Sequence, residues 1–517
     1  MSFERLAGIL LHPTSLPSRN EIGDFGPEAY KFADFLFESK LGLWQILPLS
    51  PPGLGNSPYS AISAFAGNPL LVSLDRLADR GWIARERLKP SAASSGGSRI
   101  DFDHVKATKL PLLREAAQNF LERGSDDRKR FENFKRESAW WLEDFVLFDV
   151  IRHVHHGDSW SAWPRELAGR EPAALHKFGV EYQRELEVER AIQFAFFEQW
   201  RALRRYAAQR GIKIVGDVAI FVNYDSSDVW RNPDLFYLDD KFQPTMVAGV
   251  PPDAFSATGQ RWGNPLYRWD VCKARGYDWW VQRMSWALAV CDIVRLDHFR
   301  GFDSYWAIPA SESTAVKGNW QPGPKDDLFK ELRKRLGDLP FIAEDLGMIT
   351  PEVYALRDRL GIPGMKVLQF AFGDPGAHIY LPHNFEPNCV VYTGTHDNDT
   401  TPGWWTSGAT PEEKRSVGAY MGEAQDGIHW AFIRAAFTSV AKQAIVPLQD
   451  VLGLGSESRM NTPSHSDGNW GWRFESGALR KDLAEKLAML SAVSDRVPAP
   501  SAAGQQRDRE VREEFAA

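Results

Sequence analysis

Residues 291–299 read CDIVRLDHF, a short apolar run whose second half carries Arg295, Asp297 and His298. An apolar run of this length with β-branched residues predicts a buried strand of a parallel sheet. Arg295 and Asp297 close the run, so they would lie at the carboxyl end of the strand, where parallel α/β proteins bind their ligands. The stretch therefore indicates an α/β fold and predicts a ligand-binding site at the carboxyl end of this strand.

Seven further runs of the same kind occur along the chain, at residues 7–12, 43–50, 212–222, 340–347, 365–372, 389–399 and 444–452. Helical stretches lie between most of them. The stretch 350–361, for example, starts with Thr350 and Pro351 and ends at Gly361, which are helix start and stop signals. Eight strand–helix units predict an α/β fold of the (β/α)8 TIM barrel type rather than a doubly wound sheet.

Two connections are too long for simple barrel loops. About 160 residues separate the second and third predicted strands, far more than a strand–helix connection needs. We therefore expect one catalytic barrel over residues 1–496 with insertions at the carboxyl end. A mostly helical subdomain would occupy about 70–210 and a loop-rich lid about 223–278, whereas residues 497–517 read as a polar tail.

Composition narrows the class of protein. The 517 residues carry a net charge of −7 and no apolar stretch of membrane-spanning length, so we expect neither nucleic-acid nor membrane partners. The start of the chain does not resemble a signal peptide. Three widely spaced cysteines fit a reducing cytoplasm and argue against a disulfide framework or zinc knuckle. The 20 tryptophans exceed the 13 tyrosines, which fits a protein that stacks sugar rings, although most should be core residues.

Acidic residues close four of the predicted strands. They are Asp217, Asp297, Glu344 and Asp397. A lone acid after a strand is most often a helix cap or an ion-pair partner, but four on one barrel rim favour catalysis. Carboxylates accompanied by arginine, histidine and aromatic residues are typical of glycosyl transfer, in which one acid attacks and another protonates.

Metal or cofactor chemistry is less favoured by the sequence. The acids come with arginine and histidine donors rather than as a bare acidic cage. The HVHHG run at 153–157 lies in the helical insertion without an acidic partner, and no glycine-rich phosphate loop follows a strand. We therefore predict neither a metal ion nor an organic cofactor in catalysis.

Longer motifs carry a specific resemblance. The segments DIVRLDHFRGF (292–302), IAEDLG (342–347) and YTGTHDNDT (392–400) resemble the signature regions of the α-amylase superfamily. With NSPYSAISAFAGNPLL (56–71), GDVAIFV (216–222), GIPGMKVLQFAF (361–372) and RMNTPSHSDGNWGWR (459–473), they resemble glycoside hydrolase family 77, the amylomaltases or 4-α-glucanotransferases. The resemblance spans about residues 5–490 and implies a family member with that fold and activity.

The resemblance implies a role for each matched residue. Asp297 resembles the nucleophile, Glu344 the general acid/base and Asp397 the third acid, which stabilises the transition state. The residues that it implies for substrate binding are Tyr59, Asp217, Trp262, Arg295, His298, Asp374, His396 and Asn461. Arg295 should also orient Asp297. One departure is the lid loop 251–262, which carries Ala254 and Ala257 where family members often have a tyrosine and an acid.

The activity that these residues imply is a retaining transfer of α-1,4-glucan segments to the 4-hydroxyl of an acceptor glucan or glucose. The expected partners are maltooligosaccharides, amylose, glycogen or starch. Two alternatives remain at this stage: an α-glucan hydrolase of the same superfamily, and a non-catalytic glucan-binding protein. The second is disfavoured, since binding alone does not need Asp297, Glu344 and Asp397 together.

Overall fold

The eight apolar runs form the eight strands of one closed parallel barrel. The computed structural model describes residues 3–88, 98–123, 127–253, 256–373, 375–465 and 467–499. Around the barrel the strands are β1 (Leu6–Leu10), β2 (Leu43–Gln45), β3 (Lys213–Ala219), β6 (Ile293–Asp297), β9 (Phe341–Ala343), β10 (Gly364–Val367), β11 (Cys389–Tyr392) and β12 (Gln443–Pro447), which returns to β1. The predicted TIM barrel is confirmed.

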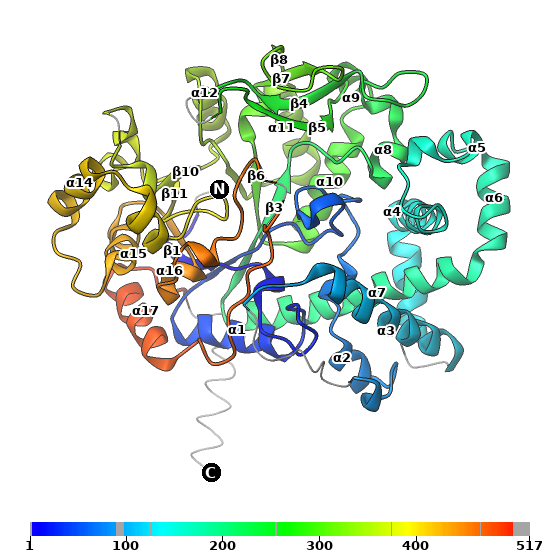
Figure 1. The fold of residues 1–517 in the computed structure, drawn as a ribbon, viewed down its shortest axis with the longest axis horizontal. Helices are drawn as coiled ribbons and strands as arrows, with labels where there is room; N and C mark the ends of the chain where they lie inside the picture. The colour runs from blue at the N-terminus through cyan, green and yellow to red at the C-terminus, as the bar shows by residue number, and fades with distance from the viewer. Residues whose placement is uncertain are drawn as a thin grey trace.

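Helices surround this barrel, as Figure 1 shows. They include α1 (Pro27–Glu38), α10 (Asp278–Val290), α11 (Lys325–Leu336), α12 (Pro351–Leu360), α15 (Ile428–Thr438) and α17 (Lys481–Val493). The strands are almost fully buried because the helices cover their outer face and the barrel fills its own interior. The helix α12 ends at Gly361, whose φ of 67° lies in the left-handed region that favours glycine.

Between β2 and β3 the chain forms a helical region. It contains α2 (Leu74–Asp79), α3 (Phe102–Arg123), α4 (Arg128–Val154), α5 (Arg165–Ala168), α6 (Pro172–Glu181) and α7 (Gln183–Gln209). The helix α7 packs against α3 and α4 on one side and against α1 of the barrel on the other. Buried aromatic residues such as Trp82, Phe120 and Phe194 fill the space between these helices, so many tryptophans serve packing alone.

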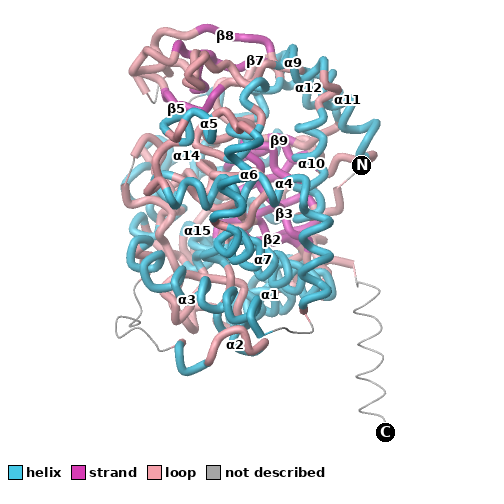
Figure 2. Tube along the Cα trace, turned by 90° about the vertical axis from the view of Figure 1, so that its right-hand side faces the viewer, coloured by secondary structure: helices cyan, strands magenta, loops and turns pink. Residues whose placement is uncertain are grey.

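A second, antiparallel sheet covers one side of the barrel (Figures 1 and 2). Its strands are β4 (Met246–Val250), β5 (Gln260–Pro265), β7 (Ser304–Pro309) and β8 (Asn319–Pro322), in the order β5-β4-β7-β8. Two of them fall in the region 223–278, which the sequence predicted as loop-rich, and the other two follow β6. The sheet was missed because β5 is only partly buried, β8 is largely exposed and neither has an apolar run, so only long-range pairing defines them.

The remaining helices lie in the connections between strands or directly after β12: α8 (Ser227–Arg231), α9 (Trp269–Ala274), α13 (Thr401–Gly403), α14 (Pro411–Met421) and α16 (Leu448–Leu452). Among the helices that the structure describes, none combines the length and the apolar character that a membrane span requires. The predicted tail at 497–517 lies, beyond residue 499, outside the described residues.

Candidate active site

Arg295 links two carboxylates at the carboxyl ends of neighbouring strands. The register of β3 and β6 pairs Asp217 with Arg295, and the Arg295 Nη1 donates to Asp217 Oδ1 at 2.9 Å and Oδ2 at 2.7 Å. The same Nη1 lies 3.0 Å from Asp297 Oδ1. Burial would lower the pKa of Arg295, but the two aspartates raise it well above its usual range. The guanidinium therefore stays charged and pairs with both aspartates.

The two aspartates differ in their access to a ligand. The Asp217 side chain is fully buried, whereas 28% of the Asp297 side chain is exposed. Burial raises the pKa of Asp217, although the Arg295 charge acts in the opposite direction. The Asp217 carboxylate is held by Arg295 and has no contact with solvent, and its predicted role in substrate binding stays a prediction. The bonds of this carboxylate to Arg295 and Tyr59 hold both of these side chains in place.

Tyr59 contacts both the buried Asp217 carboxylate and the rings of His396 and Trp470. The Tyr59 Oη donates to Asp217 Oδ2 at 2.7 Å, and its ring is stacked on His396 with centroids 5.1 Å apart and planes at 15°. The Trp470 ring lies 5.8 Å from Tyr59 and 6.0 Å from His396. Trp470 was not singled out from the sequence, although it lies in the motif at 459–473. The position of Trp470 inside that motif was the feature of the sequence that could have indicated a role in the site.

Glu344 follows β9 and is held by two backbone N–H groups. His298 N donates to Glu344 Oε2 at 2.8 Å, and Leu346 N donates to Oε1 at 2.9 Å. Burial, together with the charge of Asp297, raises the pKa of Glu344 to about 7, although Arg295 and the two N–H groups act in the opposite direction. A carboxyl with this pKa can both donate and accept a proton near neutral pH.

The antiparallel sheet brings Trp262 to the same rim. Trp262, on β5, contacts the His298 ring edge-on at a centroid distance of 4.8 Å, and 39% of it is exposed. His298 has a left-handed backbone with φ 53°, and its buried Nε2 has no hydrogen-bond partner in the described part of the chain. Burial lowers the pKa of His298 to about 4, so this ring is neutral at pH 7 and free to bond a ligand hydroxyl.

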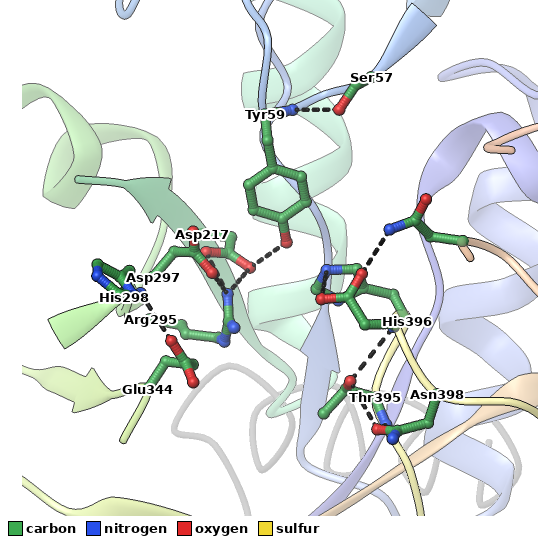
Figure 3. Close-up of polar contacts among 12 residues, drawn as sticks. Ser57, Tyr59, Asp217, Arg295, Asp297, His298, Glu344, Thr395, His396 and Asn398 are labelled. Atoms are coloured by element: carbon green, nitrogen blue, oxygen red, sulfur yellow. Dashed lines mark hydrogen bonds and ion pairs between the residues drawn. The ribbon is translucent and has the colours of Figure 1, made fainter. Parts of the chain in front are cut away.

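Asp397 lies on the loop after β11, in contact with His396. Asn461 Nδ2 donates to Asp397 Oδ1 at 2.6 Å, and His396 Nε2 lies 3.5 Å from Asp397 Oδ2. Arg459, which was not predicted, donates from Nη2 to the Asp397 carbonyl oxygen at 2.6 Å. Figure 3 shows the Asp297, Arg295 and Glu344 side chains on one side of Tyr59 and the His396 loop on the other.

The structure thus brings together ten of the predicted site residues at one barrel rim. They are Tyr59, Asp217, Trp262, Arg295, Asp297, His298, Glu344, His396, Asp397 and Asn461. Asp374 and Ala254 lie outside the described residues. In the described ranges no cluster of three or more His, Cys, Asp and Glu side chains could hold a metal ion, and His153 of the HVHHG run contacts Arg114. The absence of a cofactor stays a prediction.

Comparisons with known proteins agree with this arrangement. The family profile described as 4-alpha-glucanotransferase, of glycoside hydrolase family 77, matches residues 11–479. The 4-alpha-glucanotransferase of Thermus thermophilus is 47% identical over 506 residues, covering 96% of this chain and 100% of the relative. That of Synechocystis is 47% identical over 500 residues, covering 95% and 98%.

Solved structures of amylomaltases have the same fold as this chain. The amylomaltase of Streptococcus agalactiae in complex with acarbose superposes with a TM-score of 0.92 at 37% identity, covering 96% of this chain and 100% of that one. The amylomaltase of Corynebacterium glutamicum, at 18% identity, has a TM-score of 0.76, covers 95% of this chain and 75% of that one, and supports the fold alone.

Proposed function

The chain belongs to glycoside hydrolase family 77 and is a 4-α-glucanotransferase that acts on α-glucans, and from this premise we propose that it transfers glucan segments with retention, through a covalent glucosyl-enzyme on Asp297. The observation that carries the proposal is the contrast between two neighbouring acids. Asp297 is partly exposed and forms an ion pair with Arg295 at 3.0 Å, whereas Glu344 is buried and its pKa is raised to about 7. A nucleophile and a general acid need such different environments.

In the first step a donor glucan loses its reducing-end portion. Glu344 donates its proton to the glycosidic oxygen while Asp297 attacks the anomeric carbon from the opposite face. The bond to the leaving glucan breaks, the leaving oxygen keeps the proton, and a β-linked glucosyl ester forms on Asp297. Retention requires the two carboxyl groups to be about 5–5.5 Å apart. The N–H groups of His298 and Leu346 orient Glu344 for this transfer.

In the second step ionised Glu344 takes the proton from the 4-hydroxyl of an acceptor glucan or glucose. That oxygen attacks the anomeric carbon, the ester bond to Asp297 breaks, and the configuration is restored. Asp397, with 45% of its side chain exposed, bonds the hydroxyls of the flattened ring and acts mainly on the transition state. Maltooligosaccharides, amylose, glycogen or starch are the donors that we propose.

Incubation with maltotriose alone tests this function. Transfer yields glucose together with maltooligosaccharides longer than the substrate, whereas an α-glucan hydrolase yields only shorter products. Separation of the products by chromatography distinguishes the two. Retention is tested separately by NMR, since the newly formed linkages and the first-formed anomer would both have the α configuration.

Replacing Trp262 with Ala is expected to raise the ratio of hydrolysis to transfer about tenfold, equivalent to ~1.4 kcal/mol of acceptor preference. The half-exposed Trp262 ring packs on His298 beside Asp297, where it can hold an acceptor sugar against the glucosyl-enzyme and exclude water. Cleavage does not need that contact. The measurement compares glucose and reducing ends with longer glucans in a maltotriose digest.

The matched control for this change is Trp140→Ala. Trp140 is exposed to a similar extent, at 42%, but lies on the helix α4 of the helical insertion. Its loss should leave the ratio unchanged. If Trp262→Ala lowers the overall rate at an unchanged ratio, Trp262 contacts the donor or only packs, and its role in acceptor binding is wrong.

The pH dependence should follow the protonation of Glu344. Because the pKa of Glu344 is about 7 and the first step needs its protonated form, kcat/KM should fall about tenfold per pH unit above neutrality. Initial rates on maltotriose between pH 5 and pH 9, with thermal unfolding at each pH to exclude denaturation, measure this. A rate that stays constant up to pH 9 would contradict the assignment of Glu344 as the acid.

A further inference from the structure

Asp450 lies on the short helix α16, directly after β12, and is fully buried. Its Oδ2 accepts hydrogen bonds from Thr393 Oγ1 at 2.5 Å and from Thr401 Oγ1 at 2.7 Å. Its Oδ1 accepts the backbone N–H of Thr401 at 2.6 Å. One carboxyl group thus holds two threonines that are eight positions apart in the sequence and are themselves fully buried.

Those two threonines enclose the segment that carries His396 and Asp397. Within the segment, Asn398 Oδ1 accepts hydrogen bonds from Thr395 N and Thr395 Oγ1, both at 2.9 Å, as Figure 3 shows. The turn is therefore closed on itself, and both of its ends are attached to Asp450. Where the turn sits on the barrel rim depends on that attachment.

The neighbouring residue on α16 holds the second loop of the same half of the site. Gln449 Nε2 donates to the Ser458 carbonyl oxygen at 3.2 Å. Ser458 directly precedes Arg459, which together with Asn461 bonds Asp397. The helix α16 is consequently the common support of Asp397 and of the two side chains that hold it.

We propose that Asp450 is a positioning residue that fixes the height and orientation of the loop 394–400, and with it the Asp397 carboxylate, relative to Asp297 and Glu344. The inference rests on the proposed function, in which Asp397 stabilises the transition state. Since it is buried beneath the loop, Asp450 cannot reach a glucan and acts only through other residues.

The geometry predicts which substitutions of Asp450 are tolerated. An asparagine can accept the Thr401 N–H with its carbonyl oxygen and donate its two amide hydrogens to the two threonine hydroxyl oxygens. Burial raises the pKa of Asp450, whereas the three hydrogen bonds that its carboxylate accepts act in the opposite direction. Alanine makes none of the three bonds and leaves a buried backbone N–H without a partner.

Asp450→Ala is expected to lower kcat on the order of 100-fold with little change in KM, because a small displacement of a group that acts in the transition state has this effect. Asp450→Asn should stay within about tenfold of wild type. Steady-state kinetics of maltotriose disproportionation measure both. A loss in Asp450→Asn equal to that in Asp450→Ala, or a change confined to KM, would overturn the proposal.

A double-mutant comparison with Asp397→Asn distinguishes positioning from general destabilisation. If Asp450 acts through Asp397, then adding Asp450→Ala to Asp397→Asn should lower the residual rate by less than about threefold. If Asp450→Ala lowered the rate by the same factor in the wild-type enzyme and in Asp397→Asn, the inference would be overturned. Full activity of Asp397→Asn alone would instead contradict the proposed function, so the two failures are distinguishable.

Two further variants complete the experiment. Asp292 also accepts a backbone N–H, that of Ile214 at 2.8 Å, but at the opposite end of the barrel strands, so Asp292→Ala should affect stability and not kcat. If Asp450→Ala does not fold, Thr401→Val takes its place in the comparison with Asp397→Asn. It removes one hydrogen bond and should lower kcat about fivefold; an unchanged kcat would overturn the proposal.

Discussion

Replacing Asp297 with Ala is expected to reduce turnover on the order of 10⁴- to 10⁶-fold, the usual effect of losing a nucleophile, while the fold stays intact. The fold should tolerate the change because Asp297 is partly exposed and Arg295 keeps its two bonds to the buried Asp217. Maltotriose disproportionation measures the rate, and circular dichroism with thermal unfolding measures the fold.

The isosteric Asp297→Asn provides the control for shape. It keeps the side-chain volume and a polar contact for Arg295 but has no nucleophilic carboxylate, so it should be as inactive as the alanine variant. Activity within about tenfold of wild type in a folded variant would show that Asp297 is not the nucleophile.

Glu344→Gln should lower the rate on maltotriose on the order of 10³- to 10⁴-fold, since a glutamine can neither donate nor accept the proton. It preserves the shape of Glu344 and can still accept a hydrogen bond from His298 N or Leu346 N. A glycosyl fluoride donor needs no acid, because fluoride leaves without a proton. With that donor the first step should recover while the second, which needs a base, stays slow.

The glucosyl-enzyme should therefore accumulate in Glu344→Gln treated with a glycosyl fluoride. Mass spectrometry of the intact protein would show a gain of the glycosyl mass, and peptide mapping would place it on Asp297. Azide, a nucleophile that needs no base, should release it as a glycosyl azide. A glycosyl label on a residue other than Asp297 would contradict the assignment of Asp297 as nucleophile. Rapid fluoride release without accumulation of the glucosyl-enzyme would contradict the assignment of Glu344 as the base of the second step.

Much of this protein follows from local patterns of sequence. Each of the eight barrel strands lies in an apolar run, because a strand covered on both faces must be apolar throughout. The acids follow these runs because the carboxyl ends of parallel barrel strands form the rim at which active sites are built. Both features depend on residues adjacent in the chain, and the motifs at 292–302, 342–347 and 392–400 already indicated the family.

The tertiary structure decided what depends on residues far apart in the chain. Tyr59, Asp217 and His396 meet only when the barrel closes, and that closure buries the Asp217 side chain between Tyr59 and Arg295. The antiparallel sheet β5-β4-β7-β8 pairs strands from both sides of β6, and its outer strands β5 and β8 carry no apolar run that would mark them.

The protonation states also belong to the tertiary structure. The sequence placed Glu344 and Asp297 at neighbouring strand ends, but burial and the position of the Arg295 guanidinium give the two carboxyls their different properties. Asp450 has no local signal at all, since its partners Thr393 and Thr401 lie about 50 residues away. Desolvation and long-range hydrogen bonding arise from packing, so the sequence determined which groups are present and the fold determined what each can do.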